Sequence, residues 1–364
     1  MSKIKALIGA GGTGGHLFPA VAIAEEFKSQ TDDNFEAFFV GNPEKLEARI
    51  IPKLGYSFTS IPIRGFVGLL SASTITLPFK IIKSISTIRK IIKKEQPDFV
   101  LCTGAYISYP TGIAASQAKI PLILMESNVS PGKTIKILSP KADLIITSFE
   151  ATKNYFSNSE QSKVICLGNP LRKMFDNLIS KEEAREKFGL DPNVPTILIF
   201  GGSLGARAIN NAAMNAFDSF KDDNVQFIWQ TGKEYKVISE LPRNVKKLEF
   251  IDDMASAYAA ADLVISRSGA TTVAELTYNG KPSILVPLPS ASNNEQKANA
   301  EELQKNNATI IINNDEIGAK IVETINSILH NKKELEVMTN ATIKLAKKNA
   351  TKDAVMKIRE LIKK

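Results

Sequence analysis

The sequence GGTGGH at residues 11–16 follows the short apolar run of residues 4–8 and precedes a segment with helical spacing of apolar residues. In that segment Ala20, Ile23, Ala24 and Phe27 occupy positions i, i+3, i+4 and i+7. A strand, a glycine turn and a helix in this order place backbone N–H groups and the positive end of a helix dipole where an anion can bind. The stretch therefore predicts an α/β unit with a ligand site at the start of its first helix.

A second glycine stretch has the same setting. The sequence GGSLGA at residues 201–206 follows the apolar run 196–200, about 190 residues after the first stretch. Further apolar runs predict strands at residues 37–40, 99–102, 122–125 and 144–147 in the first half, and at 226–230, 247–250, 263–266, 283–286 and 309–312 in the second. Strands that alternate with helices are typical of a parallel, doubly wound sheet. The fold expected is α/β, with two Rossmann-like halves and a cleft between them.

Length and composition agree with two domains. The chain has 364 residues, of which 43% are hydrophobic, which is enough for two cores. The pattern breaks near residues 168–171, which suits a linker, and residues 335–362 are expected to form closing helices. No apolar run reaches the ~20 residues of a spanning helix, and the first residues lead into a strand rather than a signal peptide. Two cysteines without metal spacing, Cys102 and Cys166, fit a reducing compartment and buried thiols.

The net charge of +8 is concentrated in one region. Residues 48–94 contain no Asp or Glu, and within them residues 65–94 combine basic with apolar side chains. Such a composition predicts contact with an anionic membrane surface, and a core helix with one basic solvated face is the alternative. The residues expected at the membrane are Leu69, Leu70, Ile75, Phe79, Lys80 and Lys83. Nucleic acid is not expected as a partner, because no recognition motif appears.

The first glycine stretch is not a dinucleotide fingerprint. It lacks the G-x-G-x-x-G spacing, and no acidic residue ends a second strand at the expected place, which argues against NAD. His16, one of two histidines in the chain, lies at the start of the predicted helix and is a candidate general base or hydrogen-bond donor. A purely structural histidine is the alternative.

A third strand–turn–helix is predicted at residues 263–275. Its small residues leave a helix start open, so a diphosphate could lie on the N–H groups of Ala270 to Thr272. Glu275, one turn further on, could accept hydrogen bonds from a ribose diol, and an ordinary first-turn acid is the alternative. Gln296, at the start of a later helix, could reach the same ligand.

The blocks at residues 11–16, 201–206, 250–254 and 268–275, in this order, resemble the MurG family of glycosyltransferases. These peripheral membrane enzymes convert lipid I to lipid II in bacterial peptidoglycan synthesis, at the cytoplasmic face of the plasma membrane. The resemblance implies a GT-B fold. Residues 1–168, joined by a last helix at 345–364, would form the acceptor and membrane-facing domain. Residues 169–344 would bind UDP-GlcNAc. The resemblance implies no cofactor and no metal.

Site residues follow from the same resemblance, position by position. The expected UDP-GlcNAc contacts are Thr13, Gly14, Gly15, Asn128, Arg172, Ser203, Ile251, Ala270, Thr271, Thr272, Val273, Ala274, Glu275 and Gln296. The backbone of Ile251 would meet the uracil, and Glu275 the ribose hydroxyls. Gly104 and Tyr106 would lie on the acceptor side. The first candidate for the catalytic base is His16, and the second is Glu126.

The chain departs from the family pattern at a few positions. On the acceptor side these are Ala105, Tyr109, Met125 and Ser127, and Leu204 replaces a glutamine in the second glycine stretch. The expected reaction is an inverting transfer of GlcNAc to the 4-hydroxyl of MurNAc in lipid I. Three alternatives stay open: a GT-B transferase for another membrane lipid, a UDP-GlcNAc 2-epimerase, and a membrane-associated binding module without turnover.

Overall fold

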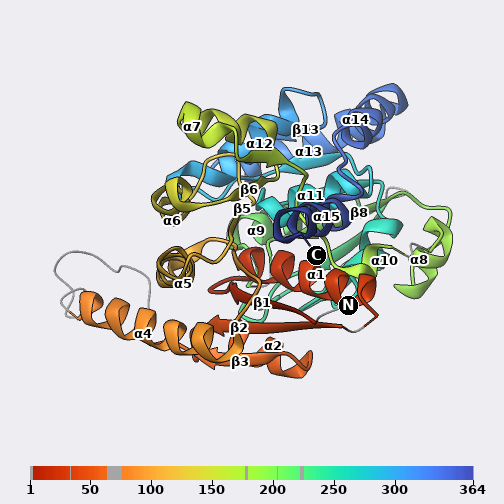
Figure 1. Ribbon diagram of the computed structural model, residues 1–364. Coiled ribbons are helices and arrows are strands. Elements are labelled where there is room, and N and C mark those ends of the chain that lie inside the picture. The colour runs from red at the N-terminus through yellow and green to blue at the C-terminus, as the bar shows by residue number, and fades with distance from the viewer. Residues whose placement is uncertain are drawn as a thin grey trace. The chain divides into compact units, whose positions relative to one another are not determined.

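The computed structural model describes residues 3–32, 34–63, 76–176, 179–202, 204–221 and 225–363. The chain packs as two compact units, of which unit 1 comprises Met1–Arg172 with Lys348–Lys364 and unit 2 comprises Lys173–Lys347. Each unit has its own parallel sheet with helices on both faces (Figure 1). No helix in the described ranges is both long and apolar enough to cross a bilayer.

The sheet of unit 1 has the order β3-β2-β1-β4-β5-β6-β7. Its strands are β1 (Ile4–Gly9), β2 (Phe35–Gly41), β3 (Ser57–Ser60), β4 (Phe99–Cys102), β5 (Leu122–Glu126), β6 (Leu144–Thr147) and β7 (Val164–Cys166). The central strand β1 pairs in parallel with β2 and with β4, so that Ala6 faces Ala37 on one side and Phe99 on the other. Continuous apolar strands of this kind need cover on both faces.

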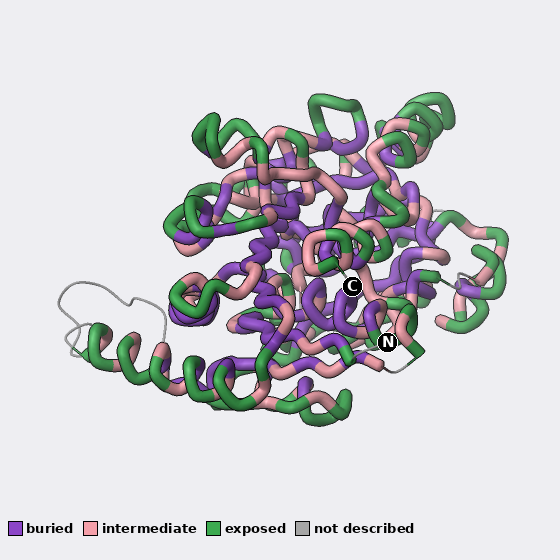
Figure 2. The backbone as a smooth tube through the Cα atoms, in the orientation of Figure 1, coloured by how far each residue is buried: buried purple, intermediate pink, exposed green. Residues whose placement is uncertain are grey.

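Helices supply that cover. The helices of unit 1 are α1 (Gly14–Gln30), α2 (Leu46–Lys53), α4 (Leu77–Glu95), α5 (Ala105–Ala118), α6 (Lys133–Leu138), α7 (Asn158–Gln161) and α15 (Ala350–Ile362). On one face α1 packs with α15, whose Val355 and Ile358 are buried in the same core as Phe27. On the other face α4 packs on α5, and Ile88 of α4 is buried. Figure 2 shows α4 with a largely exposed outer side.

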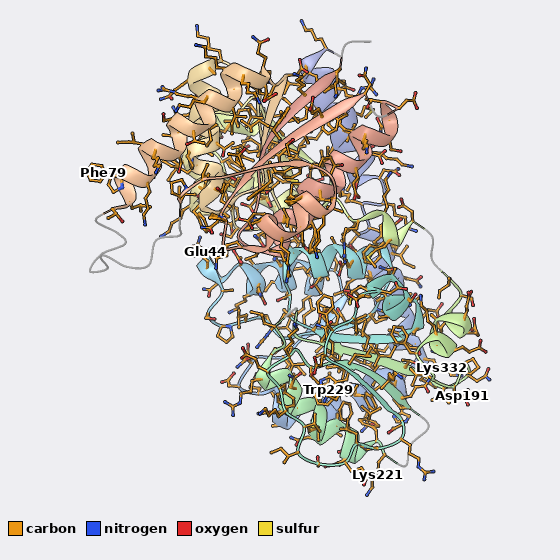
Figure 3. The ribbon with its side chains drawn as sticks, turned by 90° about the horizontal axis from the view of Figure 1, so that it is seen from below. Glu44, Phe79, Asp191, Lys221, Trp229 and Lys332 are labelled. Atoms are coloured by element: carbon orange, nitrogen blue, oxygen red, sulfur yellow. The ribbon has the colours of Figure 1, made fainter. Side chains whose placement is uncertain are left out.

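Unit 2 repeats the plan with the strand order β10-β9-β8-β11-β12-β13. Its strands are β8 (Thr196–Phe200), β9 (Gln226–Gln230), β10 (Val245–Leu248), β11 (Leu263–Ser266), β12 (Ser283–Leu285) and β13 (Thr309–Ile311). Its helices are α8 (Lys181–Lys187), α9 (Arg207–Ser219), α10 (Met254–Ala260), α11 (Ala270–Tyr278), α12 (Glu295–Gln304), α13 (Ile317–Leu329) and α14 (Lys332–Lys344). Aromatic packing of Phe217 against Phe227 and Trp229 forms part of its core. Trp229 is labelled in Figure 3.

The predicted alternation of strands and helices is confirmed, with differences at the edges. The predicted bounds of β4, β6, β8, β9 and β11 are those observed. The short strands β3 and β7 were not predicted, because β3 is largely exposed and neither strand has a long apolar run. Strand β10 begins two residues earlier than predicted, and α1 begins at Gly14, within the first glycine stretch. Pro19 is the sixth residue of α1, so it lies inside the helix and has no N–H to donate to the carbonyl oxygen of Gly15.

Both sheets contain a topological switch point. From β1 the chain moves to β2 and β3 on one side, then returns to β4 on the other. From β8 it moves to β9 and β10, then returns to β11. In open α/β sheets, ligands bind outside the carboxyl ends of the strands at such a point. Each glycine stretch lies there, after β1 in unit 1 and after β8 in unit 2.

Candidate functional site

The first glycine turn is held in place by a buried carboxylate, Glu47 of α2. This side chain is fully buried, its Oε2 accepts the N–H of Gly12 at 3.0 Å, and its Oε1 accepts the N–H of Asn42 at 2.9 Å. Gly11 (φ +153°) leaves the room that the carboxylate fills, since a Cβ there would collide with it. The sequence analysis did not predict a role for Glu47. The feature that could have indicated it is an acidic residue in the first turn of α2, the helix that follows β2.

His16 lies in the first turn of α1, against the end of β4. Its Nδ1 is 2.7 Å from the carbonyl oxygen of Thr103, and the Thr103 hydroxyl donates to the His16 carbonyl at 2.7 Å. A carbonyl only accepts, so Nδ1 carries the proton and Nε2 carries the lone pair. Burial lowers the pKa of His16 below 6.5, and the bond to Thr103 opposes this only in part. The ring is therefore neutral at pH 7 and presents a basic Nε2.

The backbone after β4 makes room for that ring. Gly104 has φ +99°, and a Cβ there would lie 3.0 Å from His16 Cε1. Ala105 follows with φ +55°, a left-handed conformation that is unusual for alanine. Tyr106 lies in the first turn of α5, and a Cβ on Gly12 would be 3.7 Å from its ring and 3.7 Å from Ala105. The β1/β4 switch point thus gathers Gly12, His16, Gly104 and Tyr106.

Glu126, the second candidate base, is engaged in holding a loop. It ends β5 and is almost fully buried. Its Oε1 accepts the N–H of Asn128 at 2.9 Å, and its Oε2 accepts the N–H of Gly132 at 2.9 Å. Both oxygens thus shape residues 126–132, which include Asn128. Of the two candidates, His16 has a ring nitrogen, Nε2, without a proton, whereas both carboxylate oxygens of Glu126 accept backbone N–H groups.

Arg172 contacts the helix that carries His16. Its guanidinium lies 4.8 Å from the centre of the Phe18 ring, at cation–π distance. Phe18 is on the first turns of α1, two residues after His16. The contact places the cation of Arg172 beside the start of α1 within unit 1.

The second glycine turn is joined to a neighbouring loop by Gln230, the last residue of β9. Gln230 is 3% exposed, its Nε2 donates to the Gly202 carbonyl at 2.9 Å, and its Oε1 accepts the Ile251 N–H at 2.9 Å. Gly202 has φ +94°, and its missing side chain faces open space. Ser203 lies outside the described residues. Sequence reasoning missed Gln230 as well, although a polar residue at the end of an apolar strand is the kind of signal that could have found it.

The third turn leads into α11 and is tied to α12. The Ser268 hydroxyl donates to the Gln296 carbonyl at 2.8 Å, and Gln296 Oε1 accepts the Leu288 N–H at 3.0 Å. The missing side chain of Gly269, the N-cap of α11, faces open space. At the β8/β11 switch point of unit 2, Gly202 and the start of α11 therefore follow the carboxyl ends of two adjacent strands.

The predicted contacts along α11 differ in their surroundings. Glu275 is mostly buried and its Oε2 accepts the hydroxyl proton of Tyr258 at 3.0 Å. Val273 is buried in the core, so its side chain does not face solvent, whereas Ala274 and Thr272 are half-buried. The hydroxyl oxygen of Thr271 is buried and has no hydrogen-bond partner in the described part of the chain.

Helix α4 exposes apolar and basic side chains together. Phe79, labelled in Figure 3, is 75% exposed. Ile82 is 66% exposed, and Lys83 is also exposed. Lys80 is half-buried, and Ser84, Ile88 and Ile92 form the narrow buried stripe. Leu69, Leu70 and Ile75 lie outside the described residues.

The cysteines and acids offer no metal centre in the ranges described. No group of three or more His, Cys, Asp or Glu is placed there to hold a metal ion. Cys102 is buried, which raises the pKa of its thiol to about 12, and Cys166 is half-buried.

Known proteins resemble this chain over its whole length. A Christiangramia forsetii protein named UDP-N-acetylglucosamine--N-acetylmuramyl-(pentapeptide) pyrophosphoryl-undecaprenol N-acetylglucosamine transferase is 38% identical over 366 residues, which cover 99% of this chain and 98% of that protein. The protein of the same name from Phocaeicola vulgatus is 39% identical over 374 residues, 99% of this chain and 96% of its own.

Solved structures and domain families agree with this. The crystal structure of Acinetobacter baumannii MurG matches with a TM-score of 0.77 and 29% identity, over 98% of this chain and 99% of that one. A putative UDP-N-acetylglucosamine 2-epimerase from Listeria monocytogenes matches with a TM-score of 0.71 over 99% of this chain and 97% of that one, at 14% identity, which shows the fold alone. Residues 6–147 match the glycosyltransferase family 28 N-terminal domain, and residues 196–356 match the glycosyltransferase family 28 C-terminal domain. The chain belongs to glycosyltransferase family 28.

Proposed function

We propose that this protein transfers GlcNAc from UDP-GlcNAc to lipid I, which is undecaprenyl-pyrophosphoryl-MurNAc-pentapeptide, and so forms lipid II for peptidoglycan. The observation that carries the proposal is the full-length similarity to transferases named for this donor and this acceptor. Two features of this chain support it. They are the neutral His16 in unit 1 and the open helix start of α11 in unit 2.

In the proposed reaction His16 is the base. Its Nε2 takes the proton from the 4-hydroxyl of MurNAc as that oxygen attacks the anomeric carbon of UDP-GlcNAc. The new bond joins this oxygen to the anomeric carbon, the bond from that carbon to the diphosphate oxygen breaks, and UDP leaves. Attack from the face opposite the leaving group inverts the configuration. Thr103 keeps Nδ1 protonated throughout and so holds the tautomer in which Nε2 can accept.

Unit 2 is proposed to bind the donor, and unit 1 to face the acceptor and the membrane. Negative charge develops on the leaving diphosphate, and the N–H groups at the start of α11, Ala270 to Thr272, are the donors proposed to stabilise it. Glu275 is proposed to accept the ribose hydroxyls, with Tyr258 holding its carboxylate in place. Gly104 and Tyr106, beside His16, are proposed to meet the acceptor.

The helix α4 is proposed to dock on the anionic cytoplasmic surface of the bacterial plasma membrane, where the protein would be peripheral. Exposed Phe79 and Ile82 would enter the interface, and Lys80 and Lys83 would attract anionic lipid, at about 1 kcal/mol each. The double variant Phe79→Glu with Lys80→Glu should weaken co-sedimentation with phosphatidylglycerol vesicles at least about tenfold. Lys136→Glu with Ile137→Glu, an exposed pair on α6 of the same unit, is the matched control. Equal loss in both variants would refute a specific α4 surface.

The reaction is tested by UDP release from UDP-GlcNAc, with and without a short-chain lipid I analogue. The proposal predicts release that depends on the analogue and a β-1,4-linked disaccharide product. Release with diacylglycerol in place of the analogue would indicate another lipid acceptor. UDP-ManNAc formed from UDP-GlcNAc alone would indicate an epimerase, and tight binding without release would indicate a binding module.

A further inference from the structure

Arg267 of unit 2 is held only by neutral groups in the part of the chain that the structure describes. This half-buried residue follows β11 and precedes the turn that opens α11. Its Nη1 donates to the carbonyl oxygens of Val286 at 3.0 Å and Pro287 at 3.2 Å, and its Nη2 donates to Asn314 Oδ1 at 2.8 Å. The guanidinium is therefore fixed in position while its positive charge is left without a carboxylate.

Arg185, a buried arginine of the same unit, differs in its third contact. It also donates to two backbone carbonyls, that of Ala260 at 3.1 Å and that of Pro192 at 2.7 Å. Its Nη2, however, binds the carboxylate of Asp262 at 2.5 Å. Asp262 directly precedes β11, whereas Arg267 directly follows it. Among the residues described, the arginine at the amino end of this strand is thus neutralised and the one at the carboxyl end is not.

A half-buried cation without a counter-ion favours an anion nearby. Burial lowers the pKa of Arg267, and no charged neighbour in the described ranges opposes this, yet an arginine stays protonated at pH 7. Charges that are partly removed from water are also screened less than exposed ones. The guanidinium is anchored to the chain that follows β12 and β13, at the sheet edge where open α/β sheets bind ligands. It therefore attracts a diphosphate bound at this edge, but not an uncharged nucleoside.

We propose that the charge of Arg267 strengthens the binding of the donor diphosphate from a distance, and that Asn314 preserves this charge because its side chain is neutral. This inference rests on the proposed function, since it takes the anion to be the diphosphate at the start of α11. An aspartate in place of Asn314 would accept the same hydrogen bond and cancel the charge, as Asp262 does for Arg185.

The test measures the Kd of UDP by isothermal titration calorimetry and the Kd of uridine by competition with UDP. Thermal unfolding checks that each variant is folded. Asn314→Asp keeps an acceptor for Arg267 and adds a carboxylate, so it should weaken UDP binding about tenfold and leave uridine binding unchanged. Asn314→Leu removes the hydrogen bond and leaves the charge of Arg267. It should lower stability and keep the ratio of UDP affinity to uridine affinity.

Asn306 is the matched control for the added charge. It is exposed and precedes β13, whereas Asn314 follows that strand, and its Nδ2 donates to the Glu302 carbonyl at 2.9 Å. Asn306→Asp adds the same charge to unit 2 at the opposite end of β13 and should keep the ratio.

Three outcomes would overturn the assignment: an unchanged ratio in Asn314→Asp, an equal loss of ratio in Asn306→Asp, or a loss in Asn314→Leu as large as that in Asn314→Asp. The last outcome would assign Asn314 to the position of the turn and not to its charge. If Asn314→Leu does not fold, Asn314→Asp and Asn306→Asp decide the matter by themselves. A wild-type protein that does not bind UDP would instead contradict the proposed function.

Discussion

The two glycine turns follow the corresponding strands of two sheets whose strand order is the same apart from the additional β7 of unit 1, yet they are held by side chains of different charge. In unit 1 the turn after β1 is tied by the carboxylate of Glu47, which accepts the Gly12 N–H. In unit 2 the turn after β8 is tied by the neutral amide of Gln230, which donates to the Gly202 carbonyl. In the first turn the Gly12 N–H is therefore used to bind the Glu47 carboxylate. In the second turn it is a carbonyl group that binds Gln230, so this contact uses no N–H of the turn.

That difference indicates how the two units divide the chemistry. A fixed negative charge 3.0 Å from Gly12 N opposes a second anion at the same turn. A neutral link beside Gly202 imposes no such penalty, and the open start of α11 follows β11, the strand adjacent to β8. We expect the first turn to position His16 and to meet neutral groups, and the second to face the diphosphate.

The largest effect is expected from His16→Ala. Removal of the base should lower kcat by about 10² to 10⁴-fold, with little change in the Kd for UDP. The control is His330→Ala, the other histidine, which follows α13 in unit 2. Steady-state kinetics with the lipid I analogue and calorimetry with UDP would measure both effects. Near-normal turnover in His16→Ala would remove this residue from the chemistry.

The pH dependence should report the same residue. Because burial places the pKa of His16 below 6.5, kcat/KM should hold down to pH 6.5 and fall on the acid side of it. The unfolded chain binds this proton more tightly than the native state does, so the free energy of unfolding should also fall as the pH drops below about 6.5. An acid limb above pH 7 in the kcat/KM profile would contradict His16, with its lowered pKa, as the base.

Glu47→Gln would test the charged link directly. The isosteric amide can accept from only one of the two N–H groups, Gly12 or Asn42, so the turn should lose its position. We expect kcat to fall about tenfold or more, a larger effect than on UDP affinity. The control is Asp98→Asn, since Asp98 accepts the Lys5 N–H at the opposite end of β1. Both variants should lower stability, by about 1–3 kcal/mol. Equal losses of kcat would assign Glu47 to stability alone.

Most strands and helices, and the positions of the glycine turns, could be predicted from the sequence, because the alternation of apolar runs and glycine turns is a local pattern. The two linking residues are different, because their roles depend on contacts between distant segments. Glu47 lies in a polar helix start that is typical of a surface, and Gln230 ends a strand whose apolar residues dominate the pattern. The tautomer of His16 likewise depends on Thr103, which is 87 residues away along the chain.

The smallest effect is expected on the pH dependence of stability, from Lys281 of unit 2, which precedes β12. Burial lowers the pKa of Lys281 to about 8, where its Nζ donates to the Ala261 carbonyl. Between pH 8 and 10.5 the unfolded chain binds the Lys281 proton more tightly than the native protein does. The free energy of unfolding should therefore rise by about 3 kcal/mol as the pH increases through this range. Denaturant unfolding at several pH values should show that Lys281→Met removes this rise. A parallel pH dependence in the two proteins would contradict the shift.

The division between the two glycine turns is tested most directly by a crystal structure of the protein with UDP. We predict that the diphosphate lies on the N–H groups of Ala270 to Thr272, on the side of the Gly202 turn, and that Glu47 keeps its bond to Gly12. A diphosphate seated on the N–H groups of residues 12–15, with Glu47 displaced, would contradict the account.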